Sequence, residues 1–382
     1  SYDSETAMPK NGAPHMAETM AILSEESYKL QVNDEVRALL EKLNANSESL
    51  DEITRREVEE ELKQLKKLEN VPIEEYAAYS RLISEASVKW REAKQTNDYP
   101  LFKPYLERII AAQKSLMAHM YPGKDTYDAL LEEFSEGLSV EMLDPFFANV
   151  KAKLVPVIHA VCQSGNQADD SLLHRPFPIE GQRRLSSFVM DFLGIDRDSC
   201  VIGEVEHPFT TEFNKHDVRL TTHYHEDDVL SNMFSVAHEG GHCLYELNMG
   251  DELIGSPLSG GATMTLHESQ SRLFENMICR SREFIALLYP KMKEIFPEQM
   301  QGVSEEMLYR AANKSMPSLI RTEADELTYP LHIMVRYEIE KKLIAGTLSV
   351  DELPAEWNRL YKEYLGVDVP DDTHGVLQDS HW

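Results

Sequence analysis

The chain has 382 residues, which is long enough to bury a large hydrophobic core as one big domain or as two ordinary ones. Its 38 basic and 66 acidic residues give a formal net charge of -28, which repels phosphate backbones and anionic membrane surfaces. Neither nucleic acid nor a membrane is therefore an expected partner. The acidic excess fits a solubilising surface or a groove that attracts cationic peptides, and composition alone does not separate the two.

The four cysteines show no C-x-x-C spacing, so neither a disulfide framework nor a thiolate zinc site is indicated. A reducing, cytoplasmic setting is expected. The N-terminal segment Ser1–Thr6 has no basic stretch followed by an apolar one, and no apolar run reaches the roughly 18 residues that a membrane span needs. The sequence predicts a soluble protein that is not exported, although Ser1 leaves open the removal of a short leader.

The N-terminal third is charged and favours helices. Between about residues 25 and 120, leucines recur at helical spacing, which predicts amphipathic helices. Charge runs such as Arg55–Glu61 are interpreted as solvated helix faces rather than binding sites. A second helical stretch is expected over Val140–Cys162, followed by a surface loop at Gln163–Gln167.

A single β segment stands out in the middle of the chain. Val201–Tyr224 carries β-branched and aromatic residues, and within it Asp217–Thr222 has the alternation of a short strand. From Val229 onward the pattern is helical again, interrupted by the Gly-rich stretch Gly250–Ala262. No internal repeat and no linker rich in Pro, Gly and Ser is visible, so one mainly α domain with a small sheet is predicted.

The segment His238–His242 fits the pattern H-E-x-x-H. Two histidines four residues apart lie on one face of a helix, where both rings can reach the same metal ion at ~2.0–2.1 Å. Glu239 can approach the open position of that metal without being a ligand, and there it can take a proton from a water molecule. The motif therefore predicts a zinc site in which Glu239 is the catalytic base.

Two further features bear on this site. The adjacent glycines Gly240 and Gly241 each cost a helix ~1 kcal/mol relative to Ala, so the metal site or a neighbouring backbone is expected to pass close to them. A catalytic zinc usually has three protein ligands, and Glu268 at the start of the next helical stretch is the best candidate for the third. Spacing alone leaves Glu268 open to being an ordinary surface residue.

Longer sequence motifs include or accompany these residues. The chain contains His238–His242, His267–Arg272, Arg321–Tyr329 and His374–Asp379, with shorter matches at Tyr127–Leu131, His207–Phe209 and Asp217–Thr222. Together they resemble the thermostable zinc carboxypeptidases of the carboxypeptidase Taq type, along nearly the whole chain. By motif position, the resemblance makes His238, His242 and Glu268 the metal ligands and Glu239 the general base.

The resemblance implies a mainly helical fold of the zincin type, similar to angiotensin-converting enzyme and neurolysin. A long deep substrate groove and a small β-sheet near the active site are expected with it. Residues 1–382 would form a single peptidase domain, lacking part of the family's N- and C-terminal ends, as a truncated form or a naturally short relative. Residues 1–136 would line one side of the groove, and residues 137–382 would carry the metal site.

The function implied is a metallocarboxypeptidase that releases single amino acids from the free C-terminus of peptides by zinc-activated water. Zinc is the expected metal, the sequence leaves open whether cobalt is used in its place, and a homodimer is expected from the resemblance. The alternatives are an endopeptidase or dipeptidase of the same architecture, or a catalytically dead helical binding protein. No Ser or Cys lies in an activating motif, so no covalent intermediate is expected.

An exopeptidase must recognise the terminal carboxylate, which a planar guanidinium binds through two hydrogen bonds. Arg321 and Arg219 lie in the family-like strings and are the substrate-binding candidates, although either could pair with a nearby acid such as Glu323 or Asp217. His374 is the candidate for contacting the substrate or the developing oxyanion, with a structural role at a helix end as the alternative. Three other histidines are given no direct role: His207 and His381 are interpreted as scaffold residues, and His267 as a residue behind the ligands at most.

Overall fold

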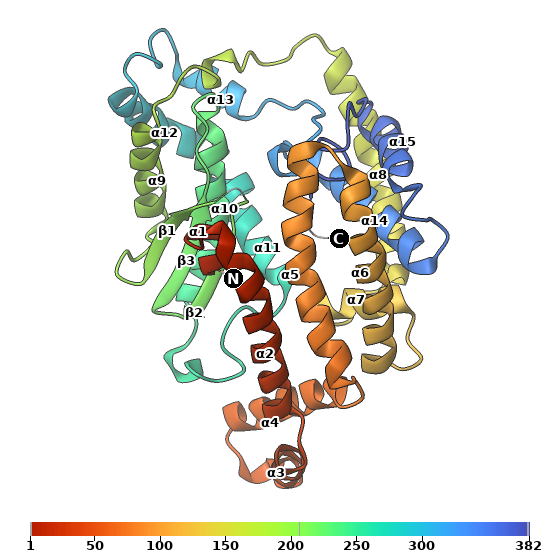
Figure 1. The fold of residues 1–382 in the computed structure, drawn as a ribbon. Coiled ribbons are helices and arrows are strands. Elements are labelled where there is room, and N and C mark those ends of the chain that lie inside the picture. Colours follow the sequence, from red (N-terminus) through yellow and green to blue (C-terminus); the bar gives the residue numbers. More distant parts are fainter. Residues whose placement is uncertain (1, 206, 380–381) are drawn as a thin grey trace. The chain divides into compact units, whose positions relative to one another are not determined.

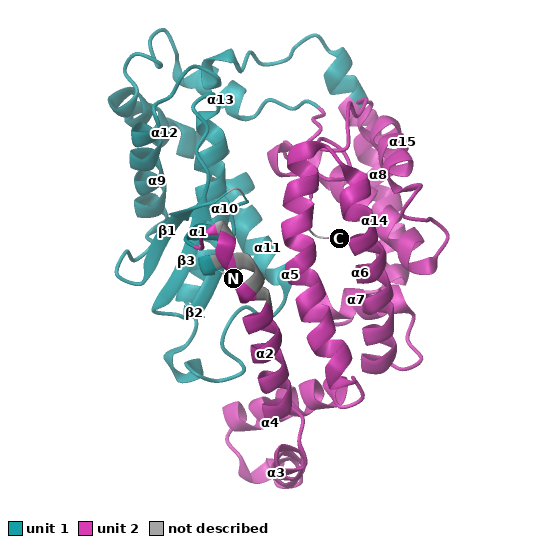
Figure 2. Cartoon of the chain, in the orientation of Figure 1, with its two compact units in different colours: residues 1–7, 159–316 teal, residues 8–158, 317–382 magenta. Residues whose placement is uncertain are grey.

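The computed structural model describes residues 2–205, 207–379 and 382. The chain divides into two compact units (Figure 2). Unit 1 comprises residues 1–7 and 159–316, and unit 2 comprises residues 8–158 and 317–382. Each unit is thus built from two separate segments of the chain.

Unit 2 is helical (Figure 1). Its helices are α2 (Ala13–Gln31), α3 (Asp34–Asn44), α4 (Glu52–Leu68), α5 (Ile73–Thr96), α6 (Tyr99–Met120), α7 (Thr126–Phe134), α14 (Tyr329–Ala345), α15 (Leu353–Leu365) and most of α8 (Val140–Gln163), together with the short 3-10 turn η6 (Arg321–Glu323). Several begin at a side chain that accepts a hydrogen bond from a backbone N–H of the first turn, as Asp51 does from Thr54. Helices α14 and α15 end at Gly346 and Gly366, whose φ angles of 72° and 73° suit glycine.

Buried hydrogen bonds join the two chain segments of unit 2. The Trp90 indole N–H on α5 donates to the carbonyl of Leu377 over 3.0 Å, and the Tyr99 hydroxyl on α6 donates to the carbonyl of Val350 over 2.7 Å. Around them a hydrophobic core draws on both segments and includes the fully buried Trp357. Because the Trp90 indole and the Tyr99 hydroxyl have hydrogen-bond partners, these two side chains are buried without an unpaired polar atom.

Unit 1 combines helices with a sheet. Its elements are α1 (Tyr2–Thr6), α9 (Ile179–Leu193), β1 (Cys200–Glu204), β2 (Thr210–Asn214), β3 (Asp217–Thr222), α10 (Val229–Leu247), α11 (Met264–Arg272), the π-helical segment η5 (Leu273–Ile278), α12 (Arg282–Ile295) and α13 (Glu305–Ala312). Within the described residues the strands form one sheet in the order β1-β3-β2, parallel between β1 and β3 and antiparallel between β2 and β3.

Helix α10 is the centre of unit 1. It contacts α9, α11 and strands β2 and β3, and it contributes Val229, Met233, Val236 and Ala237 to the core, none of which is exposed to solvent. Its first turn is capped by Asp228, which accepts a hydrogen bond from the backbone N–H of Ser231. The helix is therefore held on several sides, which fixes the direction of the side chains it presents.

The mainly helical fold with a small sheet is confirmed. The strand expected at Asp217–Thr222 is β3 to the residue, and the helix expected from Val229 is α10. The surrounding segment holds two more strands, β1 and β2, that were not separately predicted. The single peptidase domain, the division at residue 136, the groove, and the likeness to angiotensin-converting enzyme and neurolysin remain predictions.

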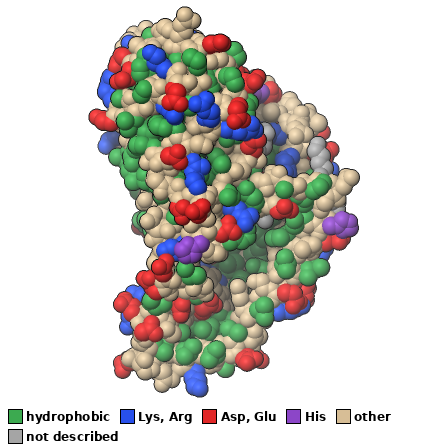
Figure 3. All heavy atoms as spheres, turned by 90° about the vertical axis from the view of Figure 1, so that its left-hand side faces the viewer, with side chains coloured by type: hydrophobic (Ala, Val, Ile, Leu, Met, Phe, Trp, Pro, Cys, Tyr) green, Lys and Arg blue, Asp and Glu red, His purple; other side chains and the backbone are tan. Residues whose placement is uncertain are grey.

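The described helices give no candidate for crossing a membrane, since none is both long and apolar enough. On the face that Figure 3 shows, acidic and basic side chains are interspersed among apolar ones, without a large area of one sign. The acidic excess is therefore not concentrated on this face. All four cysteines have free thiols.

Candidate metal centre

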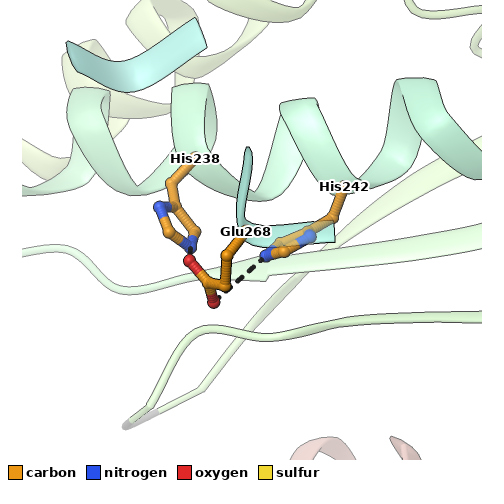
Figure 4. A group of neighbouring side chains, drawn as sticks. All are labelled: His238, His242 and Glu268. Atoms are coloured by element: carbon orange, nitrogen blue, oxygen red, sulfur yellow. Dashed lines mark ion pairs between the residues drawn. The ribbon is translucent and has the colours of Figure 1, made fainter. Parts of the chain in front are cut away.

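Helix α10 presents His238 and His242 from one face, one turn apart (Figure 4). Their ring centroids are 5.0 Å apart, and both rings point to the same side of the helix. Only about a tenth to a fifth of each side chain is exposed, 18% for His238 and 12% for His242. The helix period thus brings the two imidazoles together as the motif predicts.

Glu268 comes from helix α11, and its carboxylate lies between the two rings (Figure 4). Its oxygens are 3.8 Å from Nε2 of His238 and 3.9 Å from Nε2 of His242. One ligand atom from each of the three residues lies within 4.8 Å of the others, a grouping that can hold a metal ion. The three residues predicted as a ligand set therefore converge.

The two helices can approach each other because of Gly241. A Cβ atom at this position would lie 2.6 Å from Cα of Ser271 and 2.7 Å from the carbonyl oxygen of Gln270, both on the α11 backbone. At Gly240 a Cβ would instead meet the side chain of Leu193, at 2.5 Å. The close passage of a neighbouring backbone that the paired glycines predict is present at Gly241, where it brings α11 and Glu268 to the histidines, whereas the neighbour at Gly240 is a side chain.

Behind His238 lies a buried carboxylate. Oε2 of Glu275 is 2.9 Å from Nδ1 of His238, and the same carboxylate contacts Arg272 at 3.0 Å and Arg280 at 3.4 Å. Against the effect of burial, the hydrogen bond to His238 and the charges of the two arginines lower the pKa of Glu275 to about 2. Burial opposes protonation of His238, but its bond to Glu275 raises the pKa of this ring.

Behind His242 lies a second histidine. The Nδ1 atoms of His242 and His267 are 3.2 Å apart, and Nε2 of His267 is 2.7 Å from Oε1 of Glu246, whose side chain is 3% exposed. Burial, together with the neighbouring His238 ring, lowers the pKa of His242 to about 4. Both rings of the pair on α10 thus have Nδ1 engaged away from Glu268, so Nε2 is the nitrogen that faces it.

Glu239 is buried, with 6% of the residue exposed. Its Oε2 accepts a hydrogen bond of 2.6 Å from the hydroxyl of Thr210 on strand β2. Burial raises the pKa of the Glu239 carboxyl above its ordinary value. A carboxyl with a raised pKa holds a proton more readily at neutral pH, which suits a group that takes a proton and later returns it.

The donor set fits zinc. Zinc binds imidazole nitrogen and carboxylate oxygen at about 2.0–2.2 Å in tetrahedral geometry, which places ligand atoms roughly 3.4 Å apart. The two nitrogen-to-oxygen separations here, 3.8 and 3.9 Å, are only slightly longer. Each ring also has its second nitrogen bonded to a neighbouring side chain, which is the arrangement usual for metal-bound histidines.

Arg219 lies on strand β3 of unit 1 and is paired with an acid. Its Nε and Nη2 atoms donate to the two carboxylate oxygens of Asp217, each over 2.8 Å, and its guanidinium lies 4.5 Å from the ring centre of Phe213. The pairing with Asp217 is the structural alternative that the sequence left open. A role of Arg219 in binding substrate stays a prediction.

The other substrate-binding candidates belong to unit 2. The Nε of Arg321 donates to Oδ2 of Asp379 over 2.9 Å, and its Nη1 donates to the Tyr329 hydroxyl over 3.1 Å. His374 is half-exposed, and its Nδ1 is 2.7 Å from Oδ1 of Asp371. Arg321 thus pairs with Asp379, and contacts of Arg321 and His374 with a substrate remain predictions.

Sequence reasoning missed Thr210, Glu275 and Glu246. Glu275 had a readable signal, because Glu268, Arg272 and Glu275 follow one another at spacings of four and three, which places them on one face of a helix. Thr210 and Glu246 gave no such signal, since their partners come from distant segments. His267 contacts His242, one of the ligand candidates, His207 is half-buried, and His381 lies outside the described residues.

Comparison with known proteins identifies the family of the chain. The family model described as carboxypeptidase Taq (M32) metallopeptidase matches residues 1–382. Carboxypeptidase 1 of Bacillus subtilis is 42% identical over 381 residues, covering 100% of this chain and 76% of that protein. Thermostable carboxypeptidase 1 of Thermus thermophilus is 35% identical over 392 residues, covering 100% of this chain and 77% of that protein.

The fold agrees with these matches. The crystal structure of the M32 carboxypeptidase from Deinococcus radiodurans R1 superposes with a TM-score of 0.92 at 34% identity, covering 100% of this chain and 76% of that one. The resemblance inferred from the motifs is therefore confirmed, and the chain belongs to the carboxypeptidase Taq (M32) metallopeptidase family.

Proposed function

We propose that this member of the family is a zinc-dependent carboxypeptidase that releases single amino acids from peptides with a free C-terminus. The observation that carries the proposal is the convergence of His238, His242 and Glu268 within 4.8 Å, beside the buried Glu239 on the same helix. His238, His242 and Glu268 would hold the metal. Relatives named carboxypeptidase support the choice of reaction.

A zinc ion held by these residues would act as a Lewis acid and lower the pKa of a bound water towards ~7. Glu239 would act as the general base. Because Oε2 already accepts the Thr210 hydroxyl, Oε1 is the oxygen that would take the proton from the attacking water. The same carboxyl, with its pKa raised by burial, would then return that proton to the leaving amine.

Recognition of the substrate is assigned to three charged or polar side chains. The guanidinium of Arg321 would bind the terminal carboxylate, with Arg219 as the second candidate, because a planar guanidinium matches a carboxylate with two hydrogen bonds. His374 would donate to the substrate or to the developing oxyanion. Asp371, which contacts Nδ1 of His374, would then fix the orientation of its ring.

Three further properties belong to the proposal. Cobalt could replace zinc, because the same nitrogen and oxygen donors bind both metals. A cytoplasmic location agrees with the four free thiols. A homodimer is expected from the family resemblance, and the mass measured by light scattering across a concentration series would test it.

One experiment tests the reaction and its main rivals. The purified chain is assayed for bound zinc and then given two peptides that differ only in a free or an amidated C-terminus. Release of single amino acids from the free-acid peptide, with little or none from the amidated one, is the expected result. Internal cleavage or release of dipeptides would indicate an endopeptidase or dipeptidase, and zinc without any hydrolysis would indicate an inactive binding protein.

A further inference from the structure

The two histidines of the candidate site are supported differently. Nδ1 of His238 faces a carboxylate directly, whereas Nδ1 of His242 faces the ring of His267, which in turn contacts the carboxylate of Glu246. A chain of two hydrogen bonds, 3.2 and 2.7 Å long, therefore runs from His242 to a side chain that is 3% exposed. The function proposed above gives His267 and Glu246 no part.

Only one arrangement of protons satisfies this chain with neutral rings. A carboxylate accepts hydrogen bonds and cannot donate one, so Nε2 of His267 must carry its proton and donate to Glu246. Nδ1 of His267 is then an acceptor, and Nδ1 of His242 must be the donor across the 3.2 Å contact. The free lone pair of His242 therefore lies on Nε2, the atom that faces Glu268.

We propose that His267 is a positioning residue for His242: held by Glu246, it accepts a hydrogen bond from Nδ1–H of His242 and so directs the Nε2 lone pair of His242 to the metal. The inference rests on the metal site of the proposed function. Hydrogen bonding of this kind fixes the orientation of a ligating ring and raises its basicity. Removing such a partner typically weakens metal binding by about 10- to 100-fold.

The loop before α11 is built around this ring. A Cβ atom at Gly261 would lie 1.9 Å from Nε2 of His267 and 2.2 Å from its Cδ2, so the ring occupies the place of the missing side chain. The backbone N–H of Gly261 also donates to Oε1 of Glu246 over 3.0 Å, and the ring of Tyr245 packs edge-on against His267 at 4.9 Å. The ring is thus confined on several sides and has little freedom to turn away from His242.

Two substitutions at the ring separate positioning from simple space filling. Oδ1 of asparagine lies close to the place of the histidine Nδ1, so His267→Asn keeps an acceptor for His242. His267→Leu fills a similar space without any acceptor. The unchanged 382-residue protein and each variant are compared by chelator competition, which gives the zinc dissociation constant, and by the visible spectrum after cobalt is loaded in place of zinc.

The expected result is that His267→Leu raises the zinc dissociation constant by about 10- to 100-fold and shifts the cobalt absorption bands. His267→Asn should lie closer to the unchanged protein in both measurements, and the melting temperatures of the metal-free proteins should differ little. If the dissociation constant and the spectrum stay unchanged in both variants, the inference is wrong while the metal site stands. If Asn and Leu weaken zinc binding equally and lower the metal-free melting temperature equally, His267 only fills space and the inference is wrong.

A second pair of variants does not touch the histidine. Gly261→Ala should push the His267 ring aside and weaken zinc binding by a similar factor. Gly250→Ala, in the same loop, brings its Cβ against the movable carboxylate of Glu252 and should leave zinc binding unchanged. Equal zinc affinity in the two alanine variants would contradict the inference. If the unchanged protein takes up no zinc at all, the failure is that of the proposed metal site itself.

Discussion

Thr210 and Glu239 are joined by a short hydrogen bond between the sheet and the metal-site helix: the hydroxyl on β2 donates to Oε2 of the carboxylate on α10 over 2.6 Å. The same hydroxyl also lies 3.1 Å from the backbone carbonyl oxygen of Glu239. The bond holds Oε2 of Glu239 towards the sheet, and because the carboxylate is planar it also fixes the direction of Oε1. It thereby orients the candidate base.

The first prediction follows from this bond. Thr210→Val keeps the shape of the side chain and removes the hydroxyl donor, so kcat/KM should fall by about 10- to 100-fold, because a hydrogen bond to a charged group is worth roughly 1.5–3 kcal/mol. Zinc content should not change, because Thr210 is not among the ligand candidates. Peptide hydrolysis and metal analysis check this, and an unchanged kcat/KM would show that the bond does not orient the base.

The second prediction separates the base from the ligands. Glu239→Gln should keep zinc and lose nearly all activity, because an amide cannot take the proton from water. His238→Ala or His242→Ala should lose zinc and activity together, since a three-ligand site loses one donor. Metal analysis and single-turnover kinetics measure both properties, and near-normal kcat in Glu239→Gln would rule out its role as the base.

The third prediction concerns the paired glycines. Gly241→Ala places a Cβ 2.6 Å from the α11 backbone, which cannot yield without moving Glu268, so zinc affinity should fall and stability should drop by about 1–3 kcal/mol. Gly240→Ala meets the end of the Leu193 side chain instead and should spare zinc binding. Calorimetry on metal-free and zinc-loaded protein checks both. Weaker zinc binding in Gly240→Ala than in Gly241→Ala would contradict the geometric argument.

Features set by local periodicity could be predicted from the sequence. The spacing of His238 and His242 places both on one face of any helix, and the alternation in β3 reflects its central place in the sheet, with Val218 and Leu220 fully buried. Strands β1 and β2 lie on either side of β3 and lack a clear alternation of buried and exposed residues. Their pattern therefore carried no comparable signal.

Features set by contacts between distant segments could not be predicted in this way. Glu268 was assigned through resemblance, because spacing alone did not distinguish a ligand from a surface residue. The contact of His267 with Glu246 depends on how the Gly-rich loop closes over Gly261, which no helical or strand period encodes. Arg321 was expected to have either a substrate or the nearby Glu323 as its partner, yet its partner Asp379 comes from the far end of the chain.

The fourth prediction concerns stability and pH in unit 2. Glu356 on α15 accepts hydrogen bonds from Arg359 at 2.7 Å and from Lys342 on α14 at 2.6 Å. The hydrogen bond from Arg359 is the main reason that the pKa of Glu356 is lowered to about 2. Burial acts in the opposite direction, and the hydrogen bond from Lys342 adds to the lowering. The pKa of Glu356 is therefore lower in the folded protein than in the unfolded chain, where it is about 4.5. The charged Glu356 consequently stabilises the fold fully above pH ~5, and this contribution is lost as the pH falls towards 2.

Glu356→Gln should therefore lower the free energy of unfolding by about 1 kcal/mol at pH 7, a discounted figure because half of the Arg359 side chain is exposed to solvent. The difference from the unchanged protein should shrink as the pH is lowered from 5 towards 3. Urea unfolding across this range measures it, with Lys342→Met as a control for the contact between the two helices. A difference that grows on acidification would mean that the charge of Glu356 does not stabilise the fold.

The last prediction concerns what makes the protein an exopeptidase. A terminal carboxylate that enters a closed site loses its water and needs a hydrogen-bonded partner, whereas an amidated terminus brings no negative charge to the remaining N–H groups of a buried guanidinium. Arg321 has such a guanidinium, with 21% of its side chain exposed, and Asp379 and Tyr329 hold its Nε and Nη1 atoms. These contacts fix the plane of the guanidinium. A guanidinium held in one plane is suited to bind a planar carboxylate through two hydrogen bonds.

Arg321→Lys should weaken kcat/KM for free-acid peptides although the charge is kept, because an ammonium group cannot replace the planar fork. Loss of one buried charged contact is typically worth ~2–5 kcal/mol, or roughly a 30- to several-thousand-fold fall. Zinc content should stay the same, and Asp379 keeps Arg336 as a partner at 3.1 Å, which limits damage to the fold. Kinetics on matched free-acid and amidated peptides measure the effect, with Arg219→Lys as the control. If the preference for free C-termini survives in Arg321→Lys and Arg321→Ala but is lost in Arg219→Lys, the carboxylate is bound by Arg219 instead.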